Sequence, residues 1–333
     1  MDAMTWCTPG RLRSLMQVAL AALGLCFIGA CSVQGCVDPC PEIPLPPIPT
    51  IEPAFAVVQV GGTALLAAVT PEIANPTYQW RVSRGGPSVD IPGAMGATYK
   101  ISGAQLPDNG AQYSVAVHGV FNGGPIDIES FPTHLSVSSM PGIVFRDGEF
   151  PTSDWVSAAV SSPAASGPTH AEEQATTGGN PDAYRTQAVA LPAGPSKLVV
   201  SNEFQPATYD PATQGPIYLI EFSRDCIVLP GTVVAAPRLL IEQDGRRFAL
   251  VDDAAQCGSA AWRALVSGPI IGPEGFIQVD GPGCAAGEFC PDFSGAGRPI
   301  RFGFASSYEG IADSPAATGG FGIDNWKVTV WRR

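Results

Sequence analysis

After residue 50 the chain consists of short apolar segments separated by Gly, Pro, Asp and Asn, the residues that turns use. Ala64, Leu66 and Ala68 lie two residues apart, the spacing at which side chains of a strand share one face. The closing segment 321–331 alternates in the same way, with Ile323, Asn325, Lys327 and Thr329 against Asp324, Trp326, Val328 and Val330. Further strand candidates are 197–200, 217–223, 239–241, 247–251, 276–279 and 300–305. The pattern predicts an all-β fold.

The composition also favours strands and turns over helices. The 333 residues include 38 Gly and 33 Pro, and only 14% are charged, so helix-favouring Lys and Glu are scarce. The stretch 254–266 is rich in Ala and is a candidate helix, although Cys257, Gly258 and Trp262 count against it. A chain of this length can form two domains, each with its own core.

The formal net charge of -12 bears on the choice of partner. Nucleic acid needs a basic face for its phosphates, so the charge argues against DNA and RNA as partners. An acidic surface also keeps a protein soluble, and the charge therefore names no partner by itself.

The first thirty residues have the form of an export signal. Arg11 and Arg13 precede the apolar run 18–28, which is shorter than the roughly 20 residues of a membrane-spanning helix. The following Ile28-Gly29-Ala30-Cys31 resembles the lipobox of bacterial lipoproteins.

This resemblance implies a signal peptide over 1–30, cleavage before Cys31 and a diacylglycerol on the Cys31 sulfur. Two or more acyl chains hold a protein firmly to a membrane. Ser32 after the cysteine favours the outer membrane, by the same resemblance. The alternative is an ordinary secretory signal, with Cys31 as one more disulfide cysteine.

Cysteine usage agrees with export to an oxidising compartment. Of nine cysteines, Cys7 and Cys26 leave with the signal and Cys31 takes the lipid. The even remainder suits three disulfides, and proximity suggests Cys36 with Cys40, Cys226 with Cys257, and Cys284 with Cys290. The alternative is a zinc site, but the four C-terminal cysteines lack the tight C-x₂₋₄-C spacing of zinc ligands.

The segment 31–53 is rich in proline and is predicted to be a tether. Its prolines favour polyproline II, a semi-rigid spacer that lifts the folded part away from the lipid surface. They are Pro39, Pro41, Pro44, Pro46, Pro47 and Pro49.

The segment 54–139 carries Tyr78-Gln79-Trp80, the run 91–99 and the run 108–117. In these three places it resembles the immunoglobulin-like domains of bacterial surface proteins. The resemblance implies that Trp80 packs in the core on strand C and that Tyr113 forms the tyrosine corner. The cysteines that bridge the sheets in antibody domains would fall near Ala68 and Val115, so no such bridge is expected.

Met140-Pro141-Gly142 indicates a boundary, and 141–333 is predicted to be a larger jelly-roll β-sandwich because it holds many strand candidates. The runs 207–215, 291–294 and 322–326 resemble an uncharacterised bacterial extracellular module. More loosely, the segment is similar to the concanavalin-like and galactose-binding-like sandwiches that serve as carbohydrate-binding modules. The expected architecture is an immunoglobulin-like sandwich followed by this jelly roll.

The looser resemblance implies two kinds of site. In such folds an acidic residue of the first strand and an aspartate of the last strand share a structural calcium, which takes oxygen ligands. The resemblance implies this role for Asp147 or Glu149 together with Asp324. Solvent-facing or turn-forming carboxylates are the alternative. The candidates for stacking on a sugar ring are Trp155, Trp262 and Trp326, for which the alternative is core packing.

Evidence for an enzyme is weak, and no catalytic residue is assigned. The chain has no G-x-S-x-G nucleophile elbow, and His170 is the only histidine after residue 140. Glu221 and Asp225 are the nearest pair of carboxylates for a glycan hydrolase. The sequence favours a lipid-anchored binding or adhesion protein whose partner is a polysaccharide or another surface protein. A structural scaffold of the envelope and a glycan-active hydrolase are the alternatives.

Overall fold

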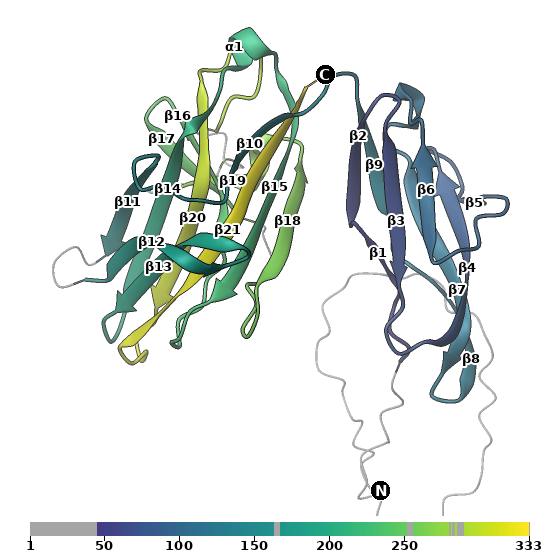
Figure 1. Cartoon of the computed structure of the whole chain (residues 1–333), viewed down its shortest axis with the longest axis horizontal. Coiled ribbons are helices and arrows are strands. Elements are labelled where there is room, and N and C mark those ends of the chain that lie inside the picture. Colours follow the sequence, from purple (N-terminus) through teal and green to yellow (C-terminus); the bar gives the residue numbers. More distant parts are fainter. Residues whose placement is uncertain are drawn as a thin grey trace, which may run out of the picture. The chain divides into compact units, whose positions relative to one another are not determined.

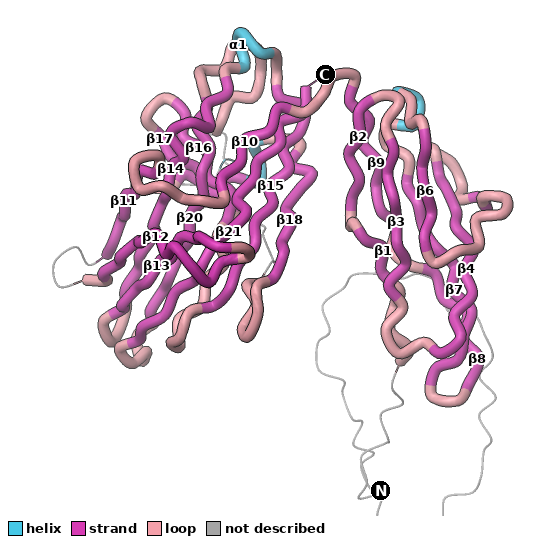
Figure 2. Tube along the Cα trace, viewed as in Figure 1, coloured by secondary structure: helices cyan, strands magenta, loops and turns pink. Residues whose placement is uncertain are grey.

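The computed structural model describes residues 45–162, 167–251, 256–279, 281, 284 and 290–332. The predicted signal peptide, Cys31, Cys36, Cys40 and most of the predicted tether lie outside the described residues. Within them strands dominate, and the helical elements are α1 (Pro211–Gln214), η1 (Leu106–Asp108) and η2 (Pro273–Gly275) (Figure 2). The prediction of an all-β fold is confirmed. No helix in the described part is long and apolar enough to cross a bilayer.

The smaller of two sandwiches comprises residues 50–138 (Figure 1). One sheet has the order β1–β3–β6, with β1 (Thr50–Glu52), β3 (Thr63–Val69) and β6 (Thr98–Ser102). The other has the order β2–β9–β7–β4–β5, with β8 beside β7. Its strands are β2 (Phe55–Gln59), β4 (Ala74–Ser83), β5 (Val89–Asp90), β7 (Gln112–Phe121), β8 (Gly124–Glu129) and β9 (Thr133–Ser138). Strand β1 lies inside the predicted tether, so the sandwich begins a few residues earlier than the sequence indicates.

The core of the smaller sandwich is centred on Trp80, which is fully buried. Its indole Nε1 donates a hydrogen bond to the Gly96 carbonyl oxygen at 2.9 Å. Tyr99 lies between Trp80 and Tyr113, with ring centroids 5.9 Å from each. Tyr113 is also buried, so both aromatic residues pack in the core. The tyrosine corner expected at Tyr113 stays a prediction.

The larger sandwich comprises residues 143–332 and has two six-stranded antiparallel sheets. The β21 sheet has the order β12–β13–β21–β15–β18, and β10 also pairs with β21. Its strands are β10 (Ile143–Asp147), β12 (Thr169–Gly179), β13 (Asp182–Leu191), β15 (Ile217–Val228), β18 (Arg263–Ile270) and β21 (Ala317–Arg332). The β20 sheet has the order β11–β14–β20–β16–β17–β19. Its strands are β11 (Trp155–Ser162), β14 (Ser196–Tyr209), β16 (Arg238–Gln243), β17 (Arg246–Leu250), β19 (Phe276–Gln278) and β20 (Ile300–Gly310).

The last strand, β21, contains a β-bulge that the sequence pattern does not show. Its pairing with β15 shifts register between Ser223 and Asp225, and Asn325 on β21 has φ 48°. The extra residue moves the inward positions by one. Ile323 is therefore buried on the same side as Trp326, which corrects the predicted strict alternation of 323–330.

Each of the six segments predicted as strands between 197 and 305 coincides with a strand, namely β14, β15, β16, β17, β19 and β20, although β17 and β19 end one residue earlier than predicted. Strands β12 and β13 fall outside the predicted segments. β12 is an edge strand that buries little of its surface, so its sequence lacks an apolar period. The candidate helix at 254–266 is wrong over its last residues, because Arg263–Ile270 is strand β18.

Candidate functional site

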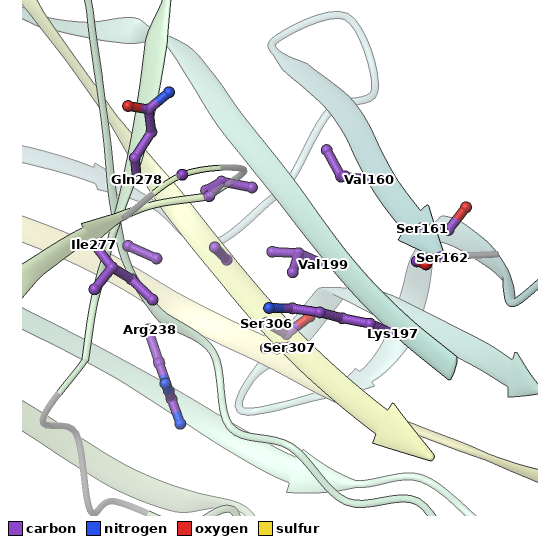
Figure 3. A pocket seen from close by; sticks show the side chains of 14 residues that line it. Val160, Ser161, Ser162, Lys197, Val199, Arg238, Ile277, Gln278, Ser306 and Ser307 are labelled. Atoms are coloured by element: carbon purple, nitrogen blue, oxygen red, sulfur yellow. The ribbon is translucent and has the colours of Figure 1, made fainter. Parts of the chain in front are cut away.

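A groove crosses the outer face of the β20 sheet, the face that points away from the sandwich core. Its volume is about 450 Å³, and residues from β11, β14, β20, β16, β17 and β19 line it (Figure 3). Residues far apart in sequence therefore meet there only because the sheet places their strands side by side. We call this feature the β20-sheet groove.

The alternation of β14 explains how the groove forms. Leu198 and Val200 are fully buried on the inner face, so the side chain of Val199 points to the outer face. Val199 pairs with Val160 of β11 on one side and with Ser307 of β20 on the other. A second hydrophobic cluster, separate from the main core, covers part of this face and consists of Val199, Leu240, Ala249, Val279 and Ala305.

The floor of the groove is aliphatic. Ile277, Val199 and Val160 follow one another across it in Figure 3, with Ala249 and Ala305 also in the lining. Val160 and Ile277 keep 43% and 38% of their surface exposed, so a ligand can reach both. None of the described lining residues is aromatic.

Two cations border this floor, in a chain whose net charge is -12. Lys197 Nζ lies 3.8 Å from Glu309 Oε1, and both side chains are more than half exposed, so this ion pair is weak. No carboxylate of the described residues forms an ion pair with Arg238. Ser162, Ser307 and Gln278 add polar groups to the lining. The groove combines an apolar floor with a basic border.

The tryptophans singled out by sequence lie elsewhere. Trp155 and Trp326 are buried in the main core, 5% and 0% exposed. Trp155 stacks on Phe204 with a centroid distance of 5.0 Å, and the Arg185 guanidinium lies 5.9 Å from its ring centroid. The expectation that these two rings stack on a sugar is corrected, because neither has a free face.

Trp262 is half-buried and precedes β18 in the other sheet. Its Nε1 donates to the Gly178 carbonyl oxygen at 3.1 Å, and its ring packs edge-on against Tyr184 at 5.2 Å. It is not part of the β20-sheet groove. A sugar-stacking role for Trp262 stays a prediction.

The three candidate calcium ligands are engaged in hydrogen bonds or lie outside the core. Asp147 Oδ1 accepts from the backbone N–H groups of Glu149 and Phe150, and Oδ2 accepts from Trp155 Nε1 at 2.7 Å. Asp324 accepts from the backbone N–H groups of Asn180 and Asn325. Glu149 is exposed.

These donors use three of the about four lone-pair sites of Asp147 and two of those of Asp324, so both carboxylates anchor loops. A calcium role for them stays a prediction. No group of three or more His, Cys, Asp or Glu in the described part of the chain is arranged to hold a metal ion. Burial raises the pKa of Asp324, whereas the two N–H donors lower it. A side chain at Gly179 would clash with Asp324, since its Cβ would lie 2.7 Å from Oδ2.

The predicted disulfide between Cys226 and Cys257 is present, with Cα atoms 4.9 Å apart. It ties β15 to the segment before β18. Cys290 Sγ lies 3.3 Å from the Cys284 carbonyl oxygen, and burial raises the pKa of the Cys284 thiol to about 12. The disulfide between Cys284 and Cys290 stays a prediction.

The carboxylate pair considered for a hydrolase is also separated by the structure. Glu221 accepts a hydrogen bond from Trp331 Nε1, and burial raises its pKa. Asp225 Oδ2 accepts from the side-chain amides of Asn180 and Asn325 at 2.9 and 2.8 Å. The two side chains bind different partners and form no common site.

The residues of the β20-sheet groove are the ones that the sequence did not reveal. Val199 lies in the run 198–204, which is buried on both faces, so it shows no clear alternation. Lys197 is a single exposed cation directly before that run. Arg238 is an isolated cation at the start of a short strand. Comparison with known proteins adds no assignment: no protein-family profile and no curated protein matches the chain.

Proposed function

We propose that the chain is a lipid-anchored binding protein of the bacterial envelope, and that its larger sandwich binds a ligand in the β20-sheet groove. In this proposal the signal 1–30 directs export, Cys31 carries the lipid, and the protein resides at the outer membrane. The segment 31–53 separates the sandwiches from the lipid surface. The partner is a molecule of the cell surface or its surroundings, of the polysaccharide, lipid or protein class.

The β20-sheet groove is the observation that carries the proposal. Its volume of about 450 Å³ is within the range of ligand pockets, roughly 300–1,000 Å³. It has an apolar floor with a few polar groups at its border, which is the usual composition of a binding site. By contrast, the carboxylates Glu221 and Asp225 accept hydrogen bonds from different protein partners, which supports binding over hydrolysis.

Because Trp155 and Trp326 are buried, a carbohydrate ligand would contact other kinds of side chain. With Trp155 and Trp326 in the core, sugar rings have no stacking surface from these two residues. A polysaccharide held in the groove would instead contact aliphatic side chains and the two cations. Calcium plays no part in this proposal, in which Asp147 and Asp324 anchor loops by accepting protein hydrogen bonds.

The anchor is tested by mass spectrometry of the chain purified from membranes. The expected mature N-terminus is an acylated Cys31, and Cys31→Ser is expected to move the chain from the membrane to the soluble fraction. A mature N-terminus at any other residue overturns the lipid anchor.

Binding is tested with the mature Cys31→Ser chain on an array of polysaccharides, amphiphiles and envelope proteins. Val160→Asp places a charge on the exposed floor of the groove and should abolish binding. Val156→Asp is the matched control, because Val156 is on the same strand, is 47% exposed and lies outside the groove lining. Equal binding by both variants, or no binding by the parent, would contradict the proposal.

A further inference from the structure

We propose that the β20-sheet groove binds an anionic amphiphile, a molecule with one aliphatic chain and a carboxylate or phosphate head group. The inference rests on the proposed function, because it names the ligand class of the same groove. Three features of the groove carry it: the position of its cations, the chemistry of its floor and its extent across the sheet.

The head-group position is defined by Ser307, whose side chain is exposed on β20. Glu309, Ser307 and Ala305 are successive outward positions of that strand, and Lys197 pairs with Glu309 while Arg238 pairs with Ala305. Ser307 is thus a diagonal neighbour of both cations, on opposite sides. Diagonal neighbours lie about 7–8 Å apart, within reach of long side chains. An anion at Ser307 is therefore placed between an ammonium and a guanidinium group.

The charge balance around Ser307 favours an anion over a cation. Lys197 has Glu309 as a loose partner at 3.8 Å, whereas Arg238 pairs with no carboxylate of the described chain. Glu203, on the same face, is 4% exposed and accepts from Arg247 Nε at 2.6 Å and Arg301 Nη1 at 3.3 Å. Glu242 of β16 also lies on this face, with its Oε2 3.6 Å from Arg301 Nη1. Arg247 and Arg301 thus offset the charges of Glu203 and Glu242. Among the described residues of this face, Arg238 is then the cation that faces a ligand without a carboxylate partner.

The floor next to this position suits an aliphatic chain. From Ala305 the register leads through Arg238 and Leu240 of β16 to Ala249 of β17 and Ile277 of β19. These strands span three spacings of about 4.8 Å, or roughly 14 Å. The lining along this path offers methyl and methylene groups and no aromatic ring, so it matches a flexible hydrocarbon better than a sugar ring.

The experiment uses the mature Cys31→Ser chain, so that its own lipid and detergent are absent. Isothermal titration compares dodecanoate, dodecyl phosphate, dodecyl maltoside and dodecyltrimethylammonium, each below its micelle concentration, and oligogalacturonate as an anion without a hydrocarbon chain. We expect dodecanoate or dodecyl phosphate to bind at least tenfold more tightly than the uncharged and cationic amphiphiles. The ratio of the two anionic probes distinguishes a fatty-acid-like ligand from a phospholipid-like one.

Three variants locate the binding. Arg238→Gln should weaken the anionic amphiphile about tenfold or more, since a charged hydrogen bond is lost. Ser307→Glu places a carboxylate at the head-group position and should abolish binding. Lys327→Gln, on the exposed side of the other sheet, is the control and should change nothing. Circular dichroism of each variant confirms that the sandwich is folded.

Equal affinity for the anionic, uncharged and cationic dodecyl probes overturns the inference, as does unchanged binding in Arg238→Gln. Suppose that oligogalacturonate binds the parent chain but not the Val160→Asp variant, and that dodecanoate does not bind. The inferred ligand class is then wrong, but the proposed function stands. If no probe binds and the array also yields no ligand sensitive to Val160→Asp, both the inference and the proposed function fail.

Discussion

Trp155 and Trp326 meet edge to face in the core of the larger sandwich, with ring centroids 5.5 Å apart and ring planes at 89°. Trp155 is on β11 of the β20 sheet and Trp326 is on β21 of the other sheet, so the pair joins the two layers. Phe204 packs against both rings, at 5.0 Å from Trp155 and 5.3 Å from Trp326. This aromatic contact is a structural centre of the fold.

Replacing Trp326 by Ala should therefore destabilise the larger sandwich strongly. Removal of a fully buried Trp costs about 3–5 kcal/mol, through lost burial and the cavity that remains. Trp262→Ala is the matched control and should cost much less, because the Trp262 ring is half-buried. Urea unfolding followed by circular dichroism measures both. Equal losses would contradict the core assignment of Trp326.

The fold class follows from the sequence because local patterns determine it. Turn residues separate apolar segments of strand length, and the apolar positions of these segments, Trp80 and Tyr113 among them, are buried in the cores. The pattern fails where tertiary structure overrides it. At Asn325 an extra residue shifts the inward face by one position, and in β12 an edge position removes the need for apolar residues. Neither the bulge nor the edge position of β12 can be recognised from the neighbouring residues in the sequence.

The candidate site could not be predicted because no segment contains enough of it. Lys197, Ser307 and Arg238 become neighbours through the order β14–β20–β16, which sequence spacing does not specify. Trp155 and Trp326, by contrast, stand out in the sequence, but the sequence does not show which role they have. Tryptophan suits both a core and a sugar-binding surface, and burial decides between these roles only after the two sheets have packed.

The disulfide between Cys226 and Cys257 should contribute measurably to stability. It closes a loop with a sequence separation of 31 residues, and loops of this length gain about 3–4 kcal/mol from a disulfide. The double variant Cys226→Ser/Cys257→Ser should lose that amount in urea unfolding, with Cys284→Ser/Cys290→Ser as the comparison. Peptide mapping without reduction should show the Cys226–Cys257 link and the predicted Cys284–Cys290 link. Peptides that pair Cys226 with Cys284 would contradict this connectivity.

Asp324 distinguishes a loop anchor from a calcium ligand. Its carboxylate holds the β12–β13 turn through the backbone N–H of Asn180. We expect Asp324→Ala to destabilise the chain by about 1–3 kcal/mol, because buried N–H groups lose their acceptor. The thermal midpoint should be the same with calcium and with a chelator, both for the parent chain and for the variant. A rise in the parent midpoint that needs calcium and Asp324 would restore the calcium site.

Glu172 should make the stability of the larger sandwich depend on pH. Its side chain is only 9% exposed, and its Oε1 accepts no hydrogen bond from the described residues, although His170 Nε2 lies 3.8 Å away. Burial raises the pKa of Glu172 above its usual 4.5, while the positive charges of His170 and Arg185 partly oppose the shift. Because the folded state holds the proton more tightly than the unfolded state, ionisation of Glu172 lowers the free energy of unfolding as pH rises above 4.5.

Glu172→Gln removes this ionisation and keeps the shape of the side chain. The variant should be more stable than the parent at pH 7, and the difference should shrink as pH falls and disappear below the unfolded carboxyl pKa. Glu173→Gln is the matched control, because Glu173 is the next residue, is exposed and should show no such pH dependence. Urea unfolding at a series of pH values measures the difference. A constant difference between Glu172→Gln and the parent at every pH would show that Glu172 acts through packing and not through its charge.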